Sequence, residues 1–204
     1  MPNITTVAGI TITLATKPTD IGENAKICYG TKLIKDGGKD ITSNLVHGHG
    51  HLAALRFAYM TVHISSLSVA AQNQLVRSKH LDFMVQSKRY VSADKGEFHF
   101  VMPNGLTETQ AAMMKMQWNS ALDIYKQLLA DGVKKEDARA VLPANTSTAM
   151  NITGNLQAWN DFFKLRLNSH AQGEIRSIAL DIFCKAQEHF PLVFTDKILE
   201  GYSK

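Results

Sequence analysis

The chain has 204 residues, of which 45% are hydrophobic and 20% are charged, as expected for a globular protein with one substantial core. No apolar run approaches the roughly 20 residues of a membrane span, and Met1–Thr5 does not resemble the start of a secretory signal. The net charge of +4 favours anionic ligands, which leaves nucleotides, nucleic acid and acidic cofactors open.

The N-terminal part predicts a strand followed by a short helix. Residues 10–15 alternate between larger apolar side chains and small or polar ones, which indicates a half-buried strand. Residues 21–29 have the composition of a short helix that stops at Gly30, and the Gly- and Lys-rich residues 35–39 predict an exposed loop. Residues 65–76 again have helical composition, and alternation at 98–102 predicts a second strand before Pro103.

The clearest predicted helix begins at Thr107. Thr107 and Gln110 form a capping box, in which each side chain satisfies a backbone N–H group of the other residue. Apolar side chains then recur at steps of three and four, and Gly132 supplies the C-terminal stop. The apolar stripe of this helix consists of Met114, Trp118, Ala121, Tyr125 and Leu128.

Three further helices are predicted in the C-terminal third. A short helix begins at Lys135, another begins at 153–155, and apolar residues between Ile175 and Ala186 mark a long helix that ends before Pro191. With no linker, repeat or low-complexity tract, we predict a single α/β domain over residues 1–204. Cys28 and Cys184 lie in apolar segments without a CxxC companion, which predicts two reduced, buried thiols in a cytoplasmic protein.

Residues 74–90 form the most informative segment. Basic or phosphate-binding side chains occupy six of the thirteen positions from 77 to 89, namely Arg77, Lys79, His80, Ser87, Lys88 and Arg89. A solvated surface and a nucleic-acid patch are the ordinary interpretations of such a cluster. Apolar residues interrupt it at Leu81, Phe83, Met84 and Val85, which a solvated face does not need. Nucleic-acid binding is therefore the least favoured interpretation.

The order of motifs resembles that of the flavin-dependent thymidylate synthases. That family carries Arg-His-Arg, seven residues and then Ser-x-Arg-Tyr, which here reads Arg77-Ser78-Lys79, seven residues and Ser87-Lys88-Arg89-Tyr90. Further similarity lies in 137–143 (DARAVLP), in 153–159 (TGNLQAW) and in 165–175 (LRLNSHAQGEI). The resemblance runs in order from about residue 28 to residue 194, and it implies the family's fold, a central sheet flanked by helices.

The resemblance also implies an activity. Members transfer a one-carbon unit from methylenetetrahydrofolate to C5 of dUMP, with FADH2 as hydride donor and NADPH as reductant, and they give dTMP. They are homotetramers whose sites are shared between subunits, and they need no cysteine nucleophile. By position, the substrate-binding residues are expected to be Gln74, Arg77, Ser87, Lys88, Arg89, Arg139 and Arg166, with Arg166 and Ser87 in catalysis. The FAD-binding residues are expected to be His51, Ser78, Lys79, His80, Asn155 and His170.

Alternatives stay open beside this expectation. Without the family frame, Arg139 and Arg166 suit ion pairs on helix surfaces. The run His47-x-His-x-His51 could chelate a metal if it lay on a strand, but without a nearby carboxylate or cysteine a flavin-contacting loop is favoured over a metal site. Two other functions also fit, a pyrimidine-nucleotide (dUMP or dCMP) C5 hydroxymethylase and a non-catalytic nucleotide-binding relative.

The chain departs from the family pattern on the expected flavin side. Ser78 stands in place of a histidine, Lys79 in place of an arginine, and Gln157 in place of a basic residue. Each change removes a ring or a planar fork that can orient a cofactor. We therefore expect nucleotide binding to be retained, and flavin affinity or the outcome of the reaction to be altered.

Overall fold

The computed structural model describes residues 4–5, 8–29, 41–92 and 98–203, so the predictions for Gly30 and for the loop at 35–39 lie outside the described residues. The chain divides into two compact units, each built from separate stretches of sequence. Unit 1 comprises Met1–Gly9, Ile64–Arg77 and Met84–Asn151, and unit 2 comprises Ile10–His63, Ser78–Phe83 and Ile152–Lys204. The prediction of a single domain stays a prediction, and each unit is described by itself below.

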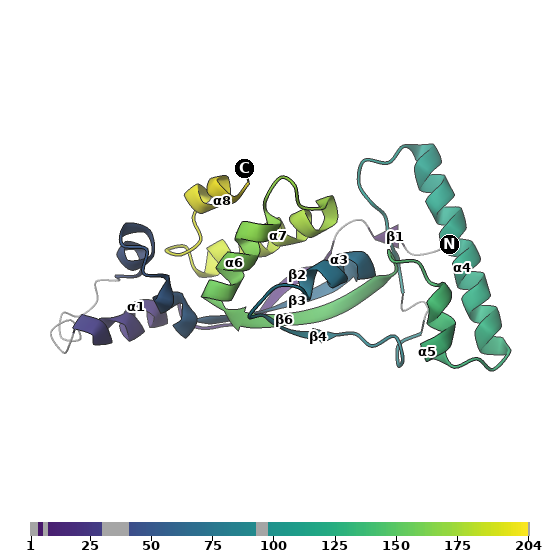
Figure 1. Cartoon of the computed structure of the whole chain (residues 1–204), viewed down its shortest axis with the longest axis horizontal. Coiled ribbons are helices and arrows are strands. Elements are labelled where there is room, and N and C mark those ends of the chain that lie inside the picture. The colour runs from purple at the N-terminus through teal and green to yellow at the C-terminus, as the bar shows by residue number, and fades with distance from the viewer. Residues whose placement is uncertain (1–3, 6–7, 30–40, 93–97, 204) are drawn as a thin grey trace. The chain divides into compact units, whose positions relative to one another are not determined.

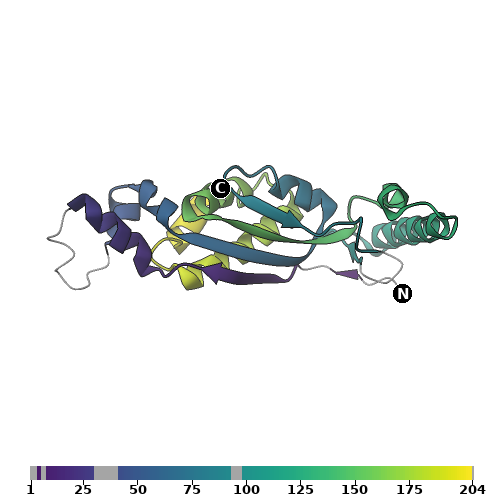
Figure 2. The same ribbon diagram turned by 90° about the horizontal axis from the view of Figure 1, so that it is seen from below.

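Mixed helices and strands confirm the predicted α/β class (Figures 1 and 2). A four-stranded sheet has the order β2 (Ile10–Ala15), β3 (Tyr59–Ser68), β6 (Ser147–Asn155) and β4 (Asp82–Val85). The Thr16 N–H donates to the Tyr59 carbonyl, and the Thr13 hydroxyl donates to the Thr61 carbonyl. Residue numbers therefore fall along β2 as they rise along β3, which makes this pair antiparallel. A separate parallel pair joins β1 (Ile4–Thr5) to β5 (Phe100–Val101).

Unit 2 packs helices against strands through an aromatic core. The helical elements of this unit are α1 (Thr19–Ala25), η1 (Lys26–Tyr29), η2 (Asn44–Gly48), η3 (Leu52–Phe57), α6 (Leu156–Arg166), α7 (Gly173–His189) and α8 (Asp196–Tyr202). The buried Trp159 indole donates to the Met60 carbonyl at 3.0 Å, which fixes α6 on β3. Phe163 contacts Phe183 and Phe194 edge-to-face, and these contacts join α6 to α7 and to the chain after it.

Unit 1 contains the long helix α4 (Glu108–Ala130) and the short elements α3 (Val69–Leu75), α5 (Lys135–Ala138) and η5 (Arg139–Val141). The predicted capping box at Thr107 and Gln110 is present, and Gly132 has φ +84°, so both predicted ends of α4 are confirmed. Its predicted stripe packs into a core with Phe98, Phe100 and Ala138. Figure 1 shows α5 beside the C-terminal half of α4.

Several sequence expectations need correction. The helix predicted at 65–76 begins only at Val69, because 65–68 belong to β3 and the Ser68 hydroxyl caps the helix. The helix start predicted at 153–155 is confirmed, because Asn155 caps the helix that begins at Leu156, but the strand over residues 147–155 was not predicted. Both free thiols are exposed, so the prediction of buried cysteines is wrong. No helix among the described ranges has the length and apolar character to cross a membrane.

Candidate functional site

The basic segment 74–90 runs through a helix end, a turn, a strand and a second turn. Gln74 lies half-buried in the last turn of α3, and Arg77 follows the helix with an exposed side chain. Residues 82–85 form β4, where the Gln86 N–H donates to the Ala149 carbonyl of β6. The apolar residues that interrupt the segment therefore lie in and beside a strand of the sheet, although Met84 is 76% exposed.

A cluster of cations lies in unit 1 around Glu136. The Arg89 Nε atom pairs with the Glu136 carboxylate at 2.8 Å, and the Arg139 Nε atom donates to the Glu136 carbonyl at 3.0 Å. The Ser87 hydroxyl accepts a hydrogen bond from the Arg89 N–H at 3.3 Å. Four residues from two segments far apart in the sequence are thus brought together. Guanidinium groups fixed by one edge keep their remaining N–H donors for an anion.

Lys88 also belongs to this cluster, and its pKa is lowered. Its Nζ atom lies 5.3 Å from the centroid of the buried Phe98 ring. Burial, with a smaller contribution from the Arg139 charge, lowers the pKa of Lys88 to about 8. Two cations held together on a half-buried surface are typical of a site that binds an anion.

The predicted flavin residues 78–80 form a tight turn in unit 2. Ser78 is buried, and its hydroxyl has no hydrogen-bond partner within the described part of the chain, whereas Lys79 and His80 are exposed. His80 has φ +64°, the left-handed conformation. A Cβ atom on Gly154 would lie 3.2 Å from the His80 carbonyl and 2.5 Å from a Leu81 methyl group. Only glycine lets β6 approach this turn so closely.

The other predicted flavin residues lie on α6 and its neighbouring turns. The Asn155 side-chain oxygen caps α6 by accepting from the Ala158 N–H at 3.0 Å, so its amide N–H donors remain for other partners. Gln157 donates to Asp161 one turn later. Arg166 is half-buried at the end of α6, and His170 is exposed in the turn that precedes α7.

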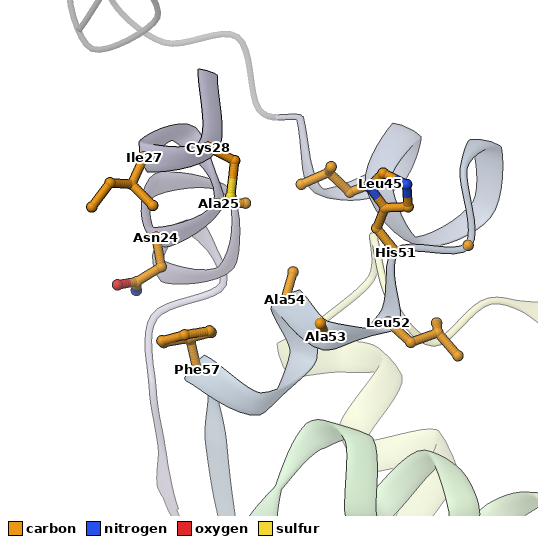
Figure 3. Close-up of a pocket in the computed structure, with 11 residues that line it drawn as sticks. Asn24, Ala25, Ile27, Cys28, Leu45, His51, Leu52, Ala53, Ala54 and Phe57 are labelled. Carbon is orange, nitrogen blue, oxygen red and sulfur yellow. The ribbon is translucent and has the colours of Figure 1, made fainter. Parts of the chain in front are cut away.

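His51 lines an apolar cavity of about 730 Å³ in unit 2. Figure 3 shows Cys28 of η1 and Leu45 of η2 on opposite sides of this cavity, with Ala53 and Ala54 of η3 between them. Its size falls within the usual range for small-molecule sites, which are mostly apolar with a few polar groups. The loop around His51 therefore borders a space of the size and apolar character of a small-molecule site.

The structure distributes the predicted site residues over both units. Ser87, Lys88, Arg89 and Arg139 come together in unit 1, where Gln74 and Arg77 also belong. All six predicted flavin residues belong to unit 2, as does Arg166. The sequence prediction missed Glu136, Phe98 and Gly154. An acidic residue three positions before Arg139 was the available signal for Glu136.

The described residues offer little for other chemistries. No group of three or more His, Cys, Asp or Glu side chains in this part of the chain could hold a metal ion. Burial and the charges of Asp181 and Glu188 raise the pKa of the Cys184 thiol, which makes it a poor nucleophile. The cation cluster of unit 1 is suited to anion binding, and the apolar cavity of unit 2 is suited to a mostly apolar ligand.

Comparison with known proteins gives concordant matches. Residues 12–192 match the family described as "Thymidylate synthase complementing protein". The flavin-dependent thymidylate synthase of Geobacter sulfurreducens is 33% identical over 84% of this chain and 78% of its own length. That of Corynebacterium diphtheriae is 32% identical over 72% of this chain, which spans 64% of the relative.

A solved structure has the same fold. The UMP/dUMP methylase PolB of Streptomyces cacaoi, bound with 5-Br dUMP, superposes with a TM-score of 0.83 over 98% of both chains. Its sequence identity is 19%, so this likeness concerns the fold alone.

Proposed function

The chain belongs to the family of the flavin-dependent thymidylate synthases, and we propose that it methylates dUMP at C5 to give dTMP. Methylenetetrahydrofolate is the proposed carbon donor and FAD, reduced by NADPH, the proposed redox cofactor. The observation that carries this proposal is the cation cluster of unit 1, because Arg89, Arg139 and Lys88, three of the expected substrate-binding residues, lie close together there.

The cluster suits a nucleotide monophosphate by charge. Arg89, Arg139 and protonated Lys88 carry three positive charges against the one negative charge of Glu136. A phosphate monoester carries a charge of about −2 near neutral pH, which such a cluster would neutralise. The Ser87 hydroxyl lies beside these cations and can donate to the phosphate or to the base.

The residues of unit 2 fit a flavin in part. His51 borders the apolar cavity, and the exposed Lys79 and His80 can contact a ring or a diphosphate. The buried Ser78 hydroxyl is closed to a ligand as placed. Bound flavin would supply the hydride that completes the methyl group. Arg166 would stabilise negative charge that develops on the pyrimidine ring.

We propose a homotetramer because one face of α4 exposes several large apolar side chains. Met113, Met116 and Ile124 lie along one side of this helix and are 65%, 70% and 52% exposed. Several exposed apolar side chains along one helix face are typical of a subunit interface. Sedimentation of the Met116→Glu/Ile124→Glu variant is expected to give smaller assemblies than the wild type, and an unchanged mass would contradict the use of this face.

Turnover with defined reactants tests the function. The chain is incubated with dUMP, methylenetetrahydrofolate, FAD and NADPH, and the mass of the nucleotide product is measured. A methylated product supports the proposal, and its loss in the Arg166→Met variant with retained dUMP binding supports the role of Arg166. A hydroxymethylated product, or dUMP binding without any product under these conditions, would reject it.

A further inference from the structure

Lys88 differs from an ordinary surface lysine because its amine is fixed. The Nζ atom lies over the Phe98 ring, and Phe98 belongs to the buried core of unit 1. A cation over an aromatic face is held electrostatically, so the amine does not move freely as a lysine in water does. The ammonium group therefore has a defined place beside the two arginines.

Among the described residues, the charged groups around Lys88 do not neutralise its ammonium. Its own segment contributes Arg89, α5 contributes Glu136, and η5 contributes Arg139, while the half-buried His99 follows Phe98. The Glu136 carboxylate is engaged by Arg89, and Arg139 repels the ammonium. These described residues thus carry an excess of positive charge, which a bound anion would neutralise.

We propose that Lys88 links phosphate binding to proton uptake, so that its amine gains a proton when the dianion of the nucleotide binds. This inference rests on the proposed function, since it takes the ligand to be dUMP. A dianion beside the amine favours the charged ammonium, and by linkage the proton favours the dianion equally.

The direction of the effect follows from the pKa of Lys88. Its pKa of about 8 means that Lys88 is mostly charged near pH 7, where binding needs no proton. Above that value the amine is increasingly neutral, so binding takes up as much as one proton and affinity falls by as much as about tenfold for each pH unit. The phosphate does not account for this proton, because its second pKa is about 6.

Isothermal titration of dUMP into the full chain tests the inference. Titrations at about pH 7 and about pH 9, each in two buffers with different ionisation heats, give the number of protons taken up. We expect little uptake at the lower pH and most of one proton at the higher pH. The Lys88→Arg variant keeps its charge at both values, so its affinity should vary less with pH and its uptake should vanish.

Two further variants make the result specific. Lys88→Met is expected to bind dUMP about tenfold more weakly at the lower pH, because it lacks the charge-assisted contact, and to take up no proton. Lys115→Met removes an exposed lysine from α4 of the same unit and should behave as the wild type. Uptake that persists in both Lys88 variants, or that is absent from a wild type that binds dUMP, overturns the inference alone. A wild type that binds no dUMP at either pH overturns the proposed function and the inference with it.

Discussion

The two compact units differ in how their predicted ligand-binding residues are held. In unit 1, two of the predicted phosphate-binding residues, Arg89 and Arg139, both contact Glu136, and the Lys88 amine lies over an aromatic ring. In unit 2, four predicted flavin residues, His51, Lys79, His80 and His170, are exposed, and Ser78 is buried. The nucleotide half is therefore organised before any ligand binds, whereas the flavin half offers fewer oriented donors.

This difference agrees with the positions at which the sequence departs from its family. Ser78, Lys79 and Gln157 all belong to unit 2, while Arg77, Arg89 and Arg139 of unit 1 keep the family residue. A pre-oriented site loses less conformational freedom on binding and so binds more tightly. We therefore expect dUMP binding to be conventional and FAD binding to be weak, and the predictions below test each half separately.

The largest effect is expected from Arg89→Met. The change removes a cation from the phosphate site and leaves the Glu136 carboxylate to repel the ligand. Loss of a charge-assisted hydrogen bond costs about 1.5–3 kcal/mol, so dUMP affinity should fall by about 100-fold. Calorimetry measures the nucleotide affinity, and flavin fluorescence should show unchanged FAD binding.

Two comparisons make this prediction specific. Adding Glu136→Gln to Arg89→Met removes the repulsion and should restore part of the dUMP affinity. Arg176→Met removes an exposed arginine from α7 and should leave dUMP binding unchanged. If the Arg176 and Arg89 variants lose affinity equally, the cluster has no special role.

A smaller effect is expected from Gly154→Ala, which tests the turn of unit 2. The new methyl group would meet the His80 carbonyl at 3.2 Å and a Leu81 methyl group at 2.5 Å. Forcing a methyl group into such a site typically costs about 1–3 kcal/mol, and displacement of the turn should also weaken FAD. Chemical denaturation measures the free energy of unfolding. Gly173→Ala, where a Cβ atom meets nothing within 4 Å, is the matched control, and equal stability of the two variants would contradict the prediction.

How far the sequence could predict the structure is clear from Thr107 and Glu136. The capping box at Thr107 was predictable because its two hydrogen bonds join residues three apart. The contacts of Glu136 were not, because Arg89 lies 47 positions away and only the tertiary fold brings the two together. The strands β3 and β6 were missed although buried positions alternate with more exposed ones along much of each, so the polar Thr61, His63 and Asn151 between buried apolar residues were the available signal.

The next prediction concerns Gln157→Arg, which restores a basic residue of the family in unit 2. Gln157 now donates to Asp161 one helical turn later, so an arginine there has a carboxylate to orient it. One added charge-assisted contact should tighten FAD by about tenfold and leave dUMP affinity unchanged. Fluorescence titration measures the flavin affinity. Unaltered FAD binding would show that position 157 does not face the cofactor, and Gln157→Met controls for loss of the amide.

The smallest effect concerns the stability of the ligand-free chain and belongs to Lys88 of unit 1. The folded chain holds the pKa of Lys88 at about 8, below the ordinary value of 10.5. Folding therefore disfavours the charged amine, and this cost is fully present below pH 8 and declines as the pH rises toward 10.5. The wild type should gain stability relative to Lys88→Met across that window, as measured by denaturation at several pH values. Lys115→Met should show no such trend, and a constant difference between the wild type and Lys88→Met would mean that the amine is solvated. If the gain in stability with pH is seen against Lys88→Met but not against Lys115→Met, folding places the Lys88 ammonium at a cost in free energy. Such a cost is expected of a phosphate site that is organised before the nucleotide binds.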